Sequence, residues 1–307
     1  MQGKRVNPNS EFQLKEYLTD RKALIDATLD GLLPGEGFFP PVIFQAVRYS
    51  LLAGGKRLRP ILCLAAAEAV GGDGKAILPV ACALEYIHTY SLIHDDLPAM
   101  DNDDYRRGRL TAHKVFGEDI AILAGDALLT EAFRLLTRSE LMPGIPPERI
   151  LTVTAEIASA AGWFGMVGGQ VLDVGSEGKS IDLETLQQIH RLKTGELILV
   201  SLRSGAILGG ASAEMLASLS DYGRQIGLAF QIADDILNVE GDRVLLGKQT
   251  GSDAARRKVT FPSLLGIEAS RARAESLIEE ALASIATFDG RAAPLRLIAG
   301  YILERKS

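Results

Sequence analysis

The spacing of prolines limits the fold of this chain more than any other feature. Prolines interrupt the first half at short intervals, and none occurs between Pro147 and Pro262. Because proline is excluded from helix interiors, the proline-free segments are free to form long helices. In Ala76–Ile93 and Ala274–Phe288, apolar residues recur at intervals of three and four, the period of a helix with a buried face. No run of alternating β-branched residues indicates a strand, so we expect an all-α fold of roughly ten or more helices.

Composition narrows the class of protein further. Of the 307 residues, 47% are hydrophobic and 23% are charged, which excludes an intrinsically disordered chain. The net charge of -6 provides no overall basic field, so we expect no nucleic-acid partner. Cys63 and Cys82 lie in apolar runs, and we expect them to be reduced core residues.

Charged residues interrupt the longest apolar runs, which predicts a protein without a membrane span. The N-terminal residues resemble no targeting signal, so we expect a cytoplasmic protein. No linker divides the chain, so we expect residues 1–307 to form one domain.

An acidic cluster closes the first of these helices. It consists of Asp95, Asp96, Asp101, Asp103 and Asp104, and Arg106 and Arg107 follow at once. Two carboxylates about 4 Å apart repel by about 4 kcal/mol at an effective dielectric of 20, so they stay ionised together only beside a cation. An all-oxygen cluster favours Mg²⁺, which shares its coordination sphere with substrate phosphates, and arginines suit such phosphates. An isolated charge run is more often a solvated loop, but this one continues a helix that also carries Glu85 and His88 among apolar residues.

A second aspartate pair occurs in the apolar segment Gly227–Asn238, where Gln231, Asp234 and Asn238 share one helical face. If the two helices face each other, they form a carboxylate-lined cavity suited to a metal–phosphate complex. Basic residues that could face it occur in Gly54–Pro60 and at Lys193, Lys248 and Lys258. The chain has no Walker A, dinucleotide-binding or serine-hydrolase motif, which argues against those chemistries.

Taken in order, these motifs resemble those of the trans-type isoprenyl diphosphate synthases, and among them the bacterial farnesyl and geranylgeranyl diphosphate synthases. The resemblance runs from about Val42 to Arg305. It is carried by Gly54–Pro60, Ser91–Gly108, Gly168–Gln170, Lys193–Gly195, Phe230–Asp242 and Lys258–Pro262. It implies a single large helical bundle around a deep central cavity, usually in a homodimer, with two aspartate-rich motifs that bind three Mg²⁺ ions.

The resemblance also implies roles for individual residues. The metal ligands match Asp95, Asp101 and Asp234, with Asp96 supporting. The contacts to an allylic diphosphate match Arg106, Lys193, Lys248 and Lys258. The contacts to isopentenyl diphosphate match Lys56, Arg59, His88 and Arg107, with Gly55 supplying backbone. Positions that line the developing carbocation match Thr194 and Gln231.

The implied reaction is ionisation, condensation and elimination, in which isopentenyl diphosphate joins dimethylallyl or geranyl diphosphate. It needs no protein nucleophile, in agreement with the motifs. Tyr90 and Ser91 lie one turn or more before Asp95, and we expect them to form the floor of the cavity. An aromatic residue at Tyr90 goes, in the resemblance, with (2E,6E)-farnesyl diphosphate as product. Geranylgeranyl diphosphate, with a C20 chain, is the alternative.

The chain departs from the family pattern at one position. Asn238 stands where the second motif usually ends in aspartate, which predicts weaker metal binding, and Asp242 is a candidate for partial compensation. Two other classes of function stay open. One is a non-catalytic helical subunit that regulates a partner synthase. The other is a terpene cyclase, against which Lys56, Arg59 and Arg107 argue because a cyclase needs no isopentenyl site.

Overall fold

The structure, a computed structural model, describes residues 8–35, 37–240 and 258–304. The first elements are α1 (Pro8–Leu32), α2 (Pro41–Leu51), α3 (Leu58–Ala69), the 3₁₀ turn η1 (Gly74–Ile77) and α4 (Leu78–Asp95). Then follow β1 (Tyr105–Arg106), β2 (Arg109–Leu110), α5 (Ala112–Phe116), α6 (Glu118–Leu136), η2 (Ser139–Leu141), α7 (Pro147–Ala161), α8 (Met166–Ser176) and α9 (Leu183–His190). The last are η3 (Arg191–Gly195), α10 (Glu196–Gly209), α11 (Ala213–Glu240), α13 (Phe261–Leu265), α14 (Ile267–Ser284), η4 (Gly290–Ala292) and α15 (Ala293–Glu304). The expected all-α fold is confirmed.

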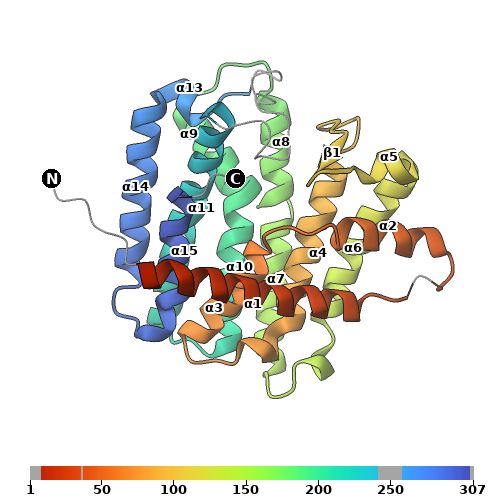
Figure 1. Cartoon of the computed structure of the whole chain (residues 1–307), viewed down its shortest axis with the longest axis horizontal. Coiled ribbons are helices and arrows are strands. Elements are labelled where there is room, and N and C mark those ends of the chain that lie inside the picture. The colour runs from red at the N-terminus through yellow and green to blue at the C-terminus, as the bar shows by residue number, and fades with distance from the viewer. Residues whose placement is uncertain (1–7, 36, 241–257, 305–307) are drawn as a thin grey trace.

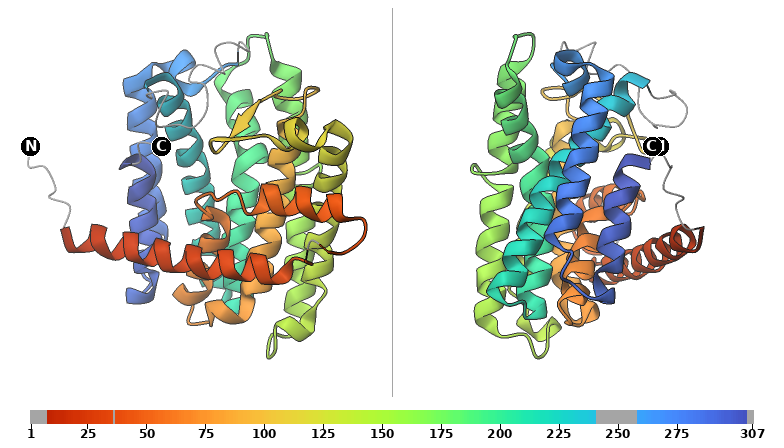
Figure 2. Two further views of the ribbon diagram at one scale, coloured as in Figure 1. Left: turned by 45° about the vertical axis from the view of Figure 1, so that its right-hand side comes forward. Right: turned by 90° about the vertical axis from the view of Figure 1, so that its left-hand side faces the viewer.

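The long helices form a bundle, and α1 crosses one side of it (Figure 1). In the right-hand view of Figure 2, α7 and α8 form the outer layer on the side opposite α1. The β1–β2 hairpin, α9 and α13 gather at one end of the bundle, at the top of Figure 1. This end receives the last residues of α4, so the first acidic cluster lies there.

Helix α4 is the central element of the core. Its residues from Pro79 to Ile87 are all buried, and such burial on every side follows from a helix that is apolar all round. Helices α3 and α10 pack closely beside it because small residues meet between them. A Cβ atom added at Gly205 would lie 1.9 Å from the carbonyl oxygen of Cys63, so only glycine allows this approach. Cys63 and Cys82 are both free and fully buried, as the sequence predicted.

Some boundaries differ from the sequence expectations. The helix expected over Ala274–Phe288 begins at Ile267 and ends at Ser284. Helix α3 begins at Leu58, so Arg59 and Pro60 lie in its first turn, where proline is tolerated because that N–H has no helical partner. The β1–β2 hairpin was not expected, because two-residue strands leave no alternating pattern in the sequence.

Two helical stretches within the described residues are long and apolar enough to cross a membrane by length and composition. In Gly74–Asp95, 72% of the apolar window is buried inside the protein, as in a core helix. Pro147–Ser176 spans α7 and α8 and is 39% buried. Length and composition alone are weak evidence, so the absence of a membrane span stays a prediction.

The junction of α9 and α10 is a π-helix, η3, over Arg191–Gly195. A π-helix closes i→i+5 hydrogen bonds, and short π segments inside α-helices occur frequently at functional sites. Helix α8 packs directly against this segment. A Cβ atom added at Gly169 would lie 2.2 Å from the backbone nitrogen of Lys193.

Candidate functional site

The two aspartate helices, α4 and α11, face a common cavity of about 430 Å³. This central cavity is lined from the first motif by Asp95, Asp101 and Arg106, and from the second by Gln231, Asp234, Asp235 and Asn238. Helix α8, η3 and the residues before α13 contribute Asp173, Glu177, Lys193 and Lys258. The structure therefore confirms that the two helices face each other, with lysines between them.

The loop after α4 folds back so that Asp101 returns to the side of Asp95. The Asp101 N–H donates to the Asp95 carbonyl at 2.7 Å, and the Asn102 N–H donates to the Leu97 carbonyl at 3.0 Å. Burial raises the pKa of the Asp95 carboxyl above its usual range; Lys193 opposes the shift and Asp101 adds to it. A carboxylate whose charge is disfavoured by burial and by a neighbouring carboxylate is stabilised by a nearby cation.

The side chain of Asp96 makes different contacts from that of its neighbour Asp95. It is 4% exposed and is not among the described residues that line the central cavity. Its carboxylate accepts a hydrogen bond from Arg106 Nε at 2.6 Å, and Arg106 also donates to Asp103 at 3.2 Å. Asp96 therefore fixes Arg106 at the rim of the cavity. Its supporting role as a metal ligand stays a prediction.

The two aspartates of the second motif both line the central cavity but make different contacts. Asp234 lines the central cavity within reach of Gln231, whose side-chain amide donates to it at 3.4 Å. Asp235 accepts the Phe261 N–H at 2.9 Å and lies 3.2 Å from His190 Nε2, so it ties α11 to the start of α13 and to α9. Tertiary hydrogen bonds of this kind leave no sequence pattern.

Sequence reasoning missed Asp173, which holds the two lysines that line the central cavity within the described residues. Its carboxylate accepts from Lys193 Nζ at 2.6 Å and from Lys258 Nζ at 3.0 Å. Burial alone would raise the pKa of Asp173, but the two ammonium groups bring it below its usual range. Asp173 lies four residues after Gly169 on α8, and this i,i+4 spacing from the Gly168–Gln170 motif was the available signal.

Of the residues that the resemblance assigns to isopentenyl diphosphate, Gly55, Arg59, His88 and Arg107 lie close together. Lys56, with Gly55, lines a second cavity of about 670 Å³ that is bounded by residues of α1 and α15. Arg107 donates to the Gly54 carbonyl, and a Cβ atom at Gly55 would lie 2.6 Å from the Arg107 guanidinium carbon. Burial and the nearby Arg59 and Arg107 guanidinium groups hold the pKa of His88 well below its usual range. Arg59 Nε is buried without a hydrogen-bond partner within the described residues. Buried donors are normally paired, so this N–H is available to bind a ligand.

The remaining predicted site residues differ in whether the structure describes them and in what they contact. Lys248 and Asp242 lie outside the described residues. Thr194 lies in η3 beside Lys193 but does not appear among the described residues that line the central cavity. Tyr90 is 7% exposed and packs edge-on against His94, and Ser91 donates to the His88 carbonyl at 2.9 Å. Neither lines the central cavity as described, so their role in product length stays a prediction.

A family model for polyprenyl synthetases matches residues 40–290. The chain belongs to this family. It is therefore a prenyltransferase that makes polyprenyl diphosphates, as the resemblance implied.

Individual relatives agree with this assignment. The prenyltransferase is 50% identical to a dimethylallyltranstransferase of Fischerella ambigua over 96% of this chain and 84% of the relative. It is 48% identical to a geranylgeranyl diphosphate synthase of Cyanophora paradoxa over 97% of this chain and 98% of the relative. An FPP/GFPP synthase from Zymomonas mobilis has the same fold, with a TM-score of 0.83, 39% identity and coverage of 96% of this chain and 99% of that one.

Proposed function

We propose that this prenyltransferase is a Mg²⁺-dependent geranylgeranyl diphosphate synthase, which adds isopentenyl diphosphate to allylic diphosphates up to a C20 chain. The observation that carries the product length is the 48% identity with a relative named for the C20 product, against 39% with the structure named an FPP/GFPP synthase. The farnesyl product was the main expectation from the sequence. It rests on Tyr90 and is the second candidate.

The donor set of the central cavity suits Mg²⁺. Asp95, Asp101 and Asp234 bring carboxylates from two helices to one cavity. Within the described residues, no group of three or more His, Cys, Asp or Glu side chains is arranged to hold a metal ion. A bound Mg²⁺ would therefore need water and substrate phosphates to complete its coordination, as it usually does beside one or two carboxylates. When bound, Mg²⁺ would neutralise the charge that develops on a departing diphosphate. Three ions, as the resemblance implies, are part of this proposal.

The chain's own residues would prepare the two substrates for condensation. Lys193, Lys258 and Arg106 would bind the allylic diphosphate at the rim of the central cavity, and their preorganised charges favour its departure as an anion. Gln231 lines the same cavity from α11, where its side-chain oxygen would face a developing carbocation. Lys56, Arg59 and Arg107 would hold isopentenyl diphosphate alongside, so that its double bond meets the cation before water does. The released diphosphate would take the final proton.

The test is a turnover assay on the purified wild-type protein. Labelled isopentenyl diphosphate is mixed with dimethylallyl, geranyl or farnesyl diphosphate, with Mg²⁺ or with EDTA, and chain lengths are read by chromatography. We expect C20 diphosphate with Mg²⁺ and none with EDTA. A product that stops at C15 would establish the farnesyl alternative, hydrocarbon product would indicate a cyclase, and no turnover would favour a regulatory subunit. In the same assay, a Tyr90→Ala variant that makes products of unchanged chain length would show that Tyr90 does not form the floor of the cavity.

We also propose that the enzyme is a homodimer, with a second copy covering the apolar face of α6, α7 and α8. Exposed apolar side chains on or between these helices are Ile122, Leu123, Leu151, Trp163, Phe164, Val167, Val171, Leu172 and Val174. Trp163 is 78% exposed, and monomers rarely expose large contiguous apolar surfaces.

Sedimentation tests the homodimer. The wild type should have about twice the chain mass of 32.9 kDa, and the Trp163→Glu variant should have the mass of the monomer. The control is Leu265→Glu, on α13 and 39% exposed, which should stay dimeric; a monomeric wild type would refute the proposal.

A further inference from the structure

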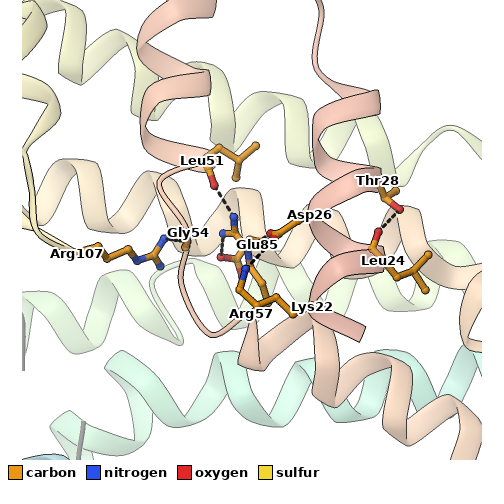
Figure 3. Close-up of polar contacts among 9 residues, drawn as sticks. All are labelled: Lys22, Leu24, Asp26, Thr28, Leu51, Gly54, Arg57, Glu85 and Arg107. Carbon is orange, nitrogen blue, oxygen red and sulfur yellow. Dashed lines mark hydrogen bonds and ion pairs between the residues drawn. The ribbon is translucent and has the colours of Figure 1, made fainter. Parts of the chain in front are cut away.

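Arg57 is a buried arginine in the basic segment Gly54–Pro60, and the proposed reaction gives it no contact with either substrate. It is 2% exposed, and its guanidinium connects three helices (Figure 3). Nη1 donates to Glu85 Oε1 on α4 at 2.6 Å, and Nε donates to Asp26 Oδ1 on α1 at 2.7 Å. Nη2 donates to the carbonyl of Leu51, the last residue of α2, at 2.7 Å. We call Arg57, Glu85 and Asp26 the Arg57 network.

The backbone at Arg57 is unusual. Its φ of 51° and ψ of 35° lie in the left-handed region, which a residue with a side chain adopts only where its surroundings impose it. Here the imposing contacts are those of the Arg57 network. Arg57 is also the residue before α3, so its side-chain contacts set where the preceding loop ends and where the helix carrying Arg59 begins.

Glu85 is the carboxylate that balances this cluster of arginines. It is 1% exposed and lies three residues before His88, on the same side of α4. Although burial lowers the pKa of Arg59 and Arg107, the Glu85 carboxylate is the largest influence that raises both. Without it, three guanidinium groups would repel one another around the loop. A buried anion of this kind keeps cationic side chains together before a diphosphate arrives.

We propose that Arg57 and Glu85 are positioning residues for the isopentenyl diphosphate site. Their ion pair fixes the Gly54–Lys56 loop against α4, so that Gly55, Lys56 and Arg59 face the same diphosphate as His88 and Arg107. The allylic site depends on other elements, since Lys193 and Lys258 are held by Asp173 on α8. Loss of the pair should therefore weaken one substrate and spare the other. This inference rests on the proposed function.

The decisive variant is Glu85→Gln, which keeps the shape and one hydrogen-bond acceptor but removes the charge. Steady-state kinetics should show a KM for isopentenyl diphosphate raised at least tenfold, with the KM for geranyl diphosphate and kcat within twofold of wild type. The matched control is Glu68→Gln. Glu68 accepts from Tyr17 at 2.7 Å and pairs with Arg21 at 2.8 Å, so it joins α1 to α3 through a similar network and lines neither substrate site. It should leave both KM values within twofold.

A milder variant keeps the proposal testable if Glu85→Gln does not fold. The side chain of Asp26 is 33% exposed, so Asp26→Asn retains the buried Arg57–Glu85 pair and should fold. We expect it to raise the KM for isopentenyl diphosphate about threefold without changing the KM for geranyl diphosphate. Equal changes in both KM values, or none in either variant that folds, would show that the network is only structural. A wild type that never consumes isopentenyl diphosphate would refute the proposed function itself, and with it this inference.

Discussion

Asp95→Ala should lower kcat by about three orders of magnitude, the upper end of the loss seen when one preorganised electrostatic group is removed from an active site. Asp95 is the last residue of α4 and lies beside Asp101 at the wall of the central cavity, opposite Asp234. Its removal takes a carboxylate from the proposed metal site. Because Asp95 is only partly buried and its raised pKa reflects an unfavourable charge, we expect the fold to keep its thermal stability. Turnover with geranyl and isopentenyl diphosphates at saturating Mg²⁺ measures the effect.

The control is Asp104→Ala, in the same acidic cluster. The Asp104 side chain is 60% exposed, pairs with Lys114 at 2.8 Å and does not line the central cavity as described. Its carbonyl, which accepts the Thr111 N–H at 3.0 Å, is unaffected by the substitution. This variant should retain at least half of the wild-type kcat. An Asp95→Ala enzyme with more than a tenth of wild-type turnover would contradict the placement of Asp95 in the site.

Gly169→Ala should lower kcat/KM for the allylic substrate by about a hundredfold, the cost of misplacing a catalytic group by about 1 Å. The added methyl would lie 2.2 Å from the Lys193 nitrogen and 2.6 Å from its Cα atom, and backbone atoms cannot move aside as a flexible side chain can. Helix α8 and η3 must then separate. Separation would move Lys193 away from Asp173, which sits one turn beyond Gly169 on α8.

Gly175→Ala, near the end of the same helix, is the matched control. Nothing lies within 4 Å of a Cβ atom there, and alanine favours a helix over glycine by about 1 kcal/mol. It should leave kcat/KM within twofold and should not lower the melting temperature. If Gly169→Ala also keeps wild-type kcat/KM, the close packing of α8 on η3 does not position Lys193.

The sequence was sufficient for the fold and for the existence of the site, because both depend on local patterns. Apolar periodicity and the absence of proline identify helices whatever they pack against, and two apolar helices that each carry paired aspartates, at the end of α4 and five residues before the end of α11, point to one shared cavity. The resemblance then placed Lys193 and Lys258 at that cavity, and the structure agrees. These inferences need only the side-chain type and its spacing along one helix.

What the sequence could not supply depends on contacts between distant segments. The members of each aspartate pair make different contacts, since Asp96 pairs with Arg106 and Asp235, although it lines the cavity beside Asp234, accepts the Phe261 N–H. Asp173 looked like one more surface carboxylate until α8 was placed against η3. Arg57 was one basic residue among several until Glu85 and Asp26 were brought to it from other helices.

The π-helix between α9 and α10 limits where the chain can gain or lose a residue. The wide turn over Arg191–Gly195 rotates α10 relative to the course that α9 alone would set, and each residue of an α-helix turns by about 100°. A deletion of one codon here would restore a regular helix, but it would turn either Lys193 out of the cavity or Leu197 and Ile198 out of the core. We therefore expect insertions and deletions to be tolerated in the connections of the bundle but not within these five residues.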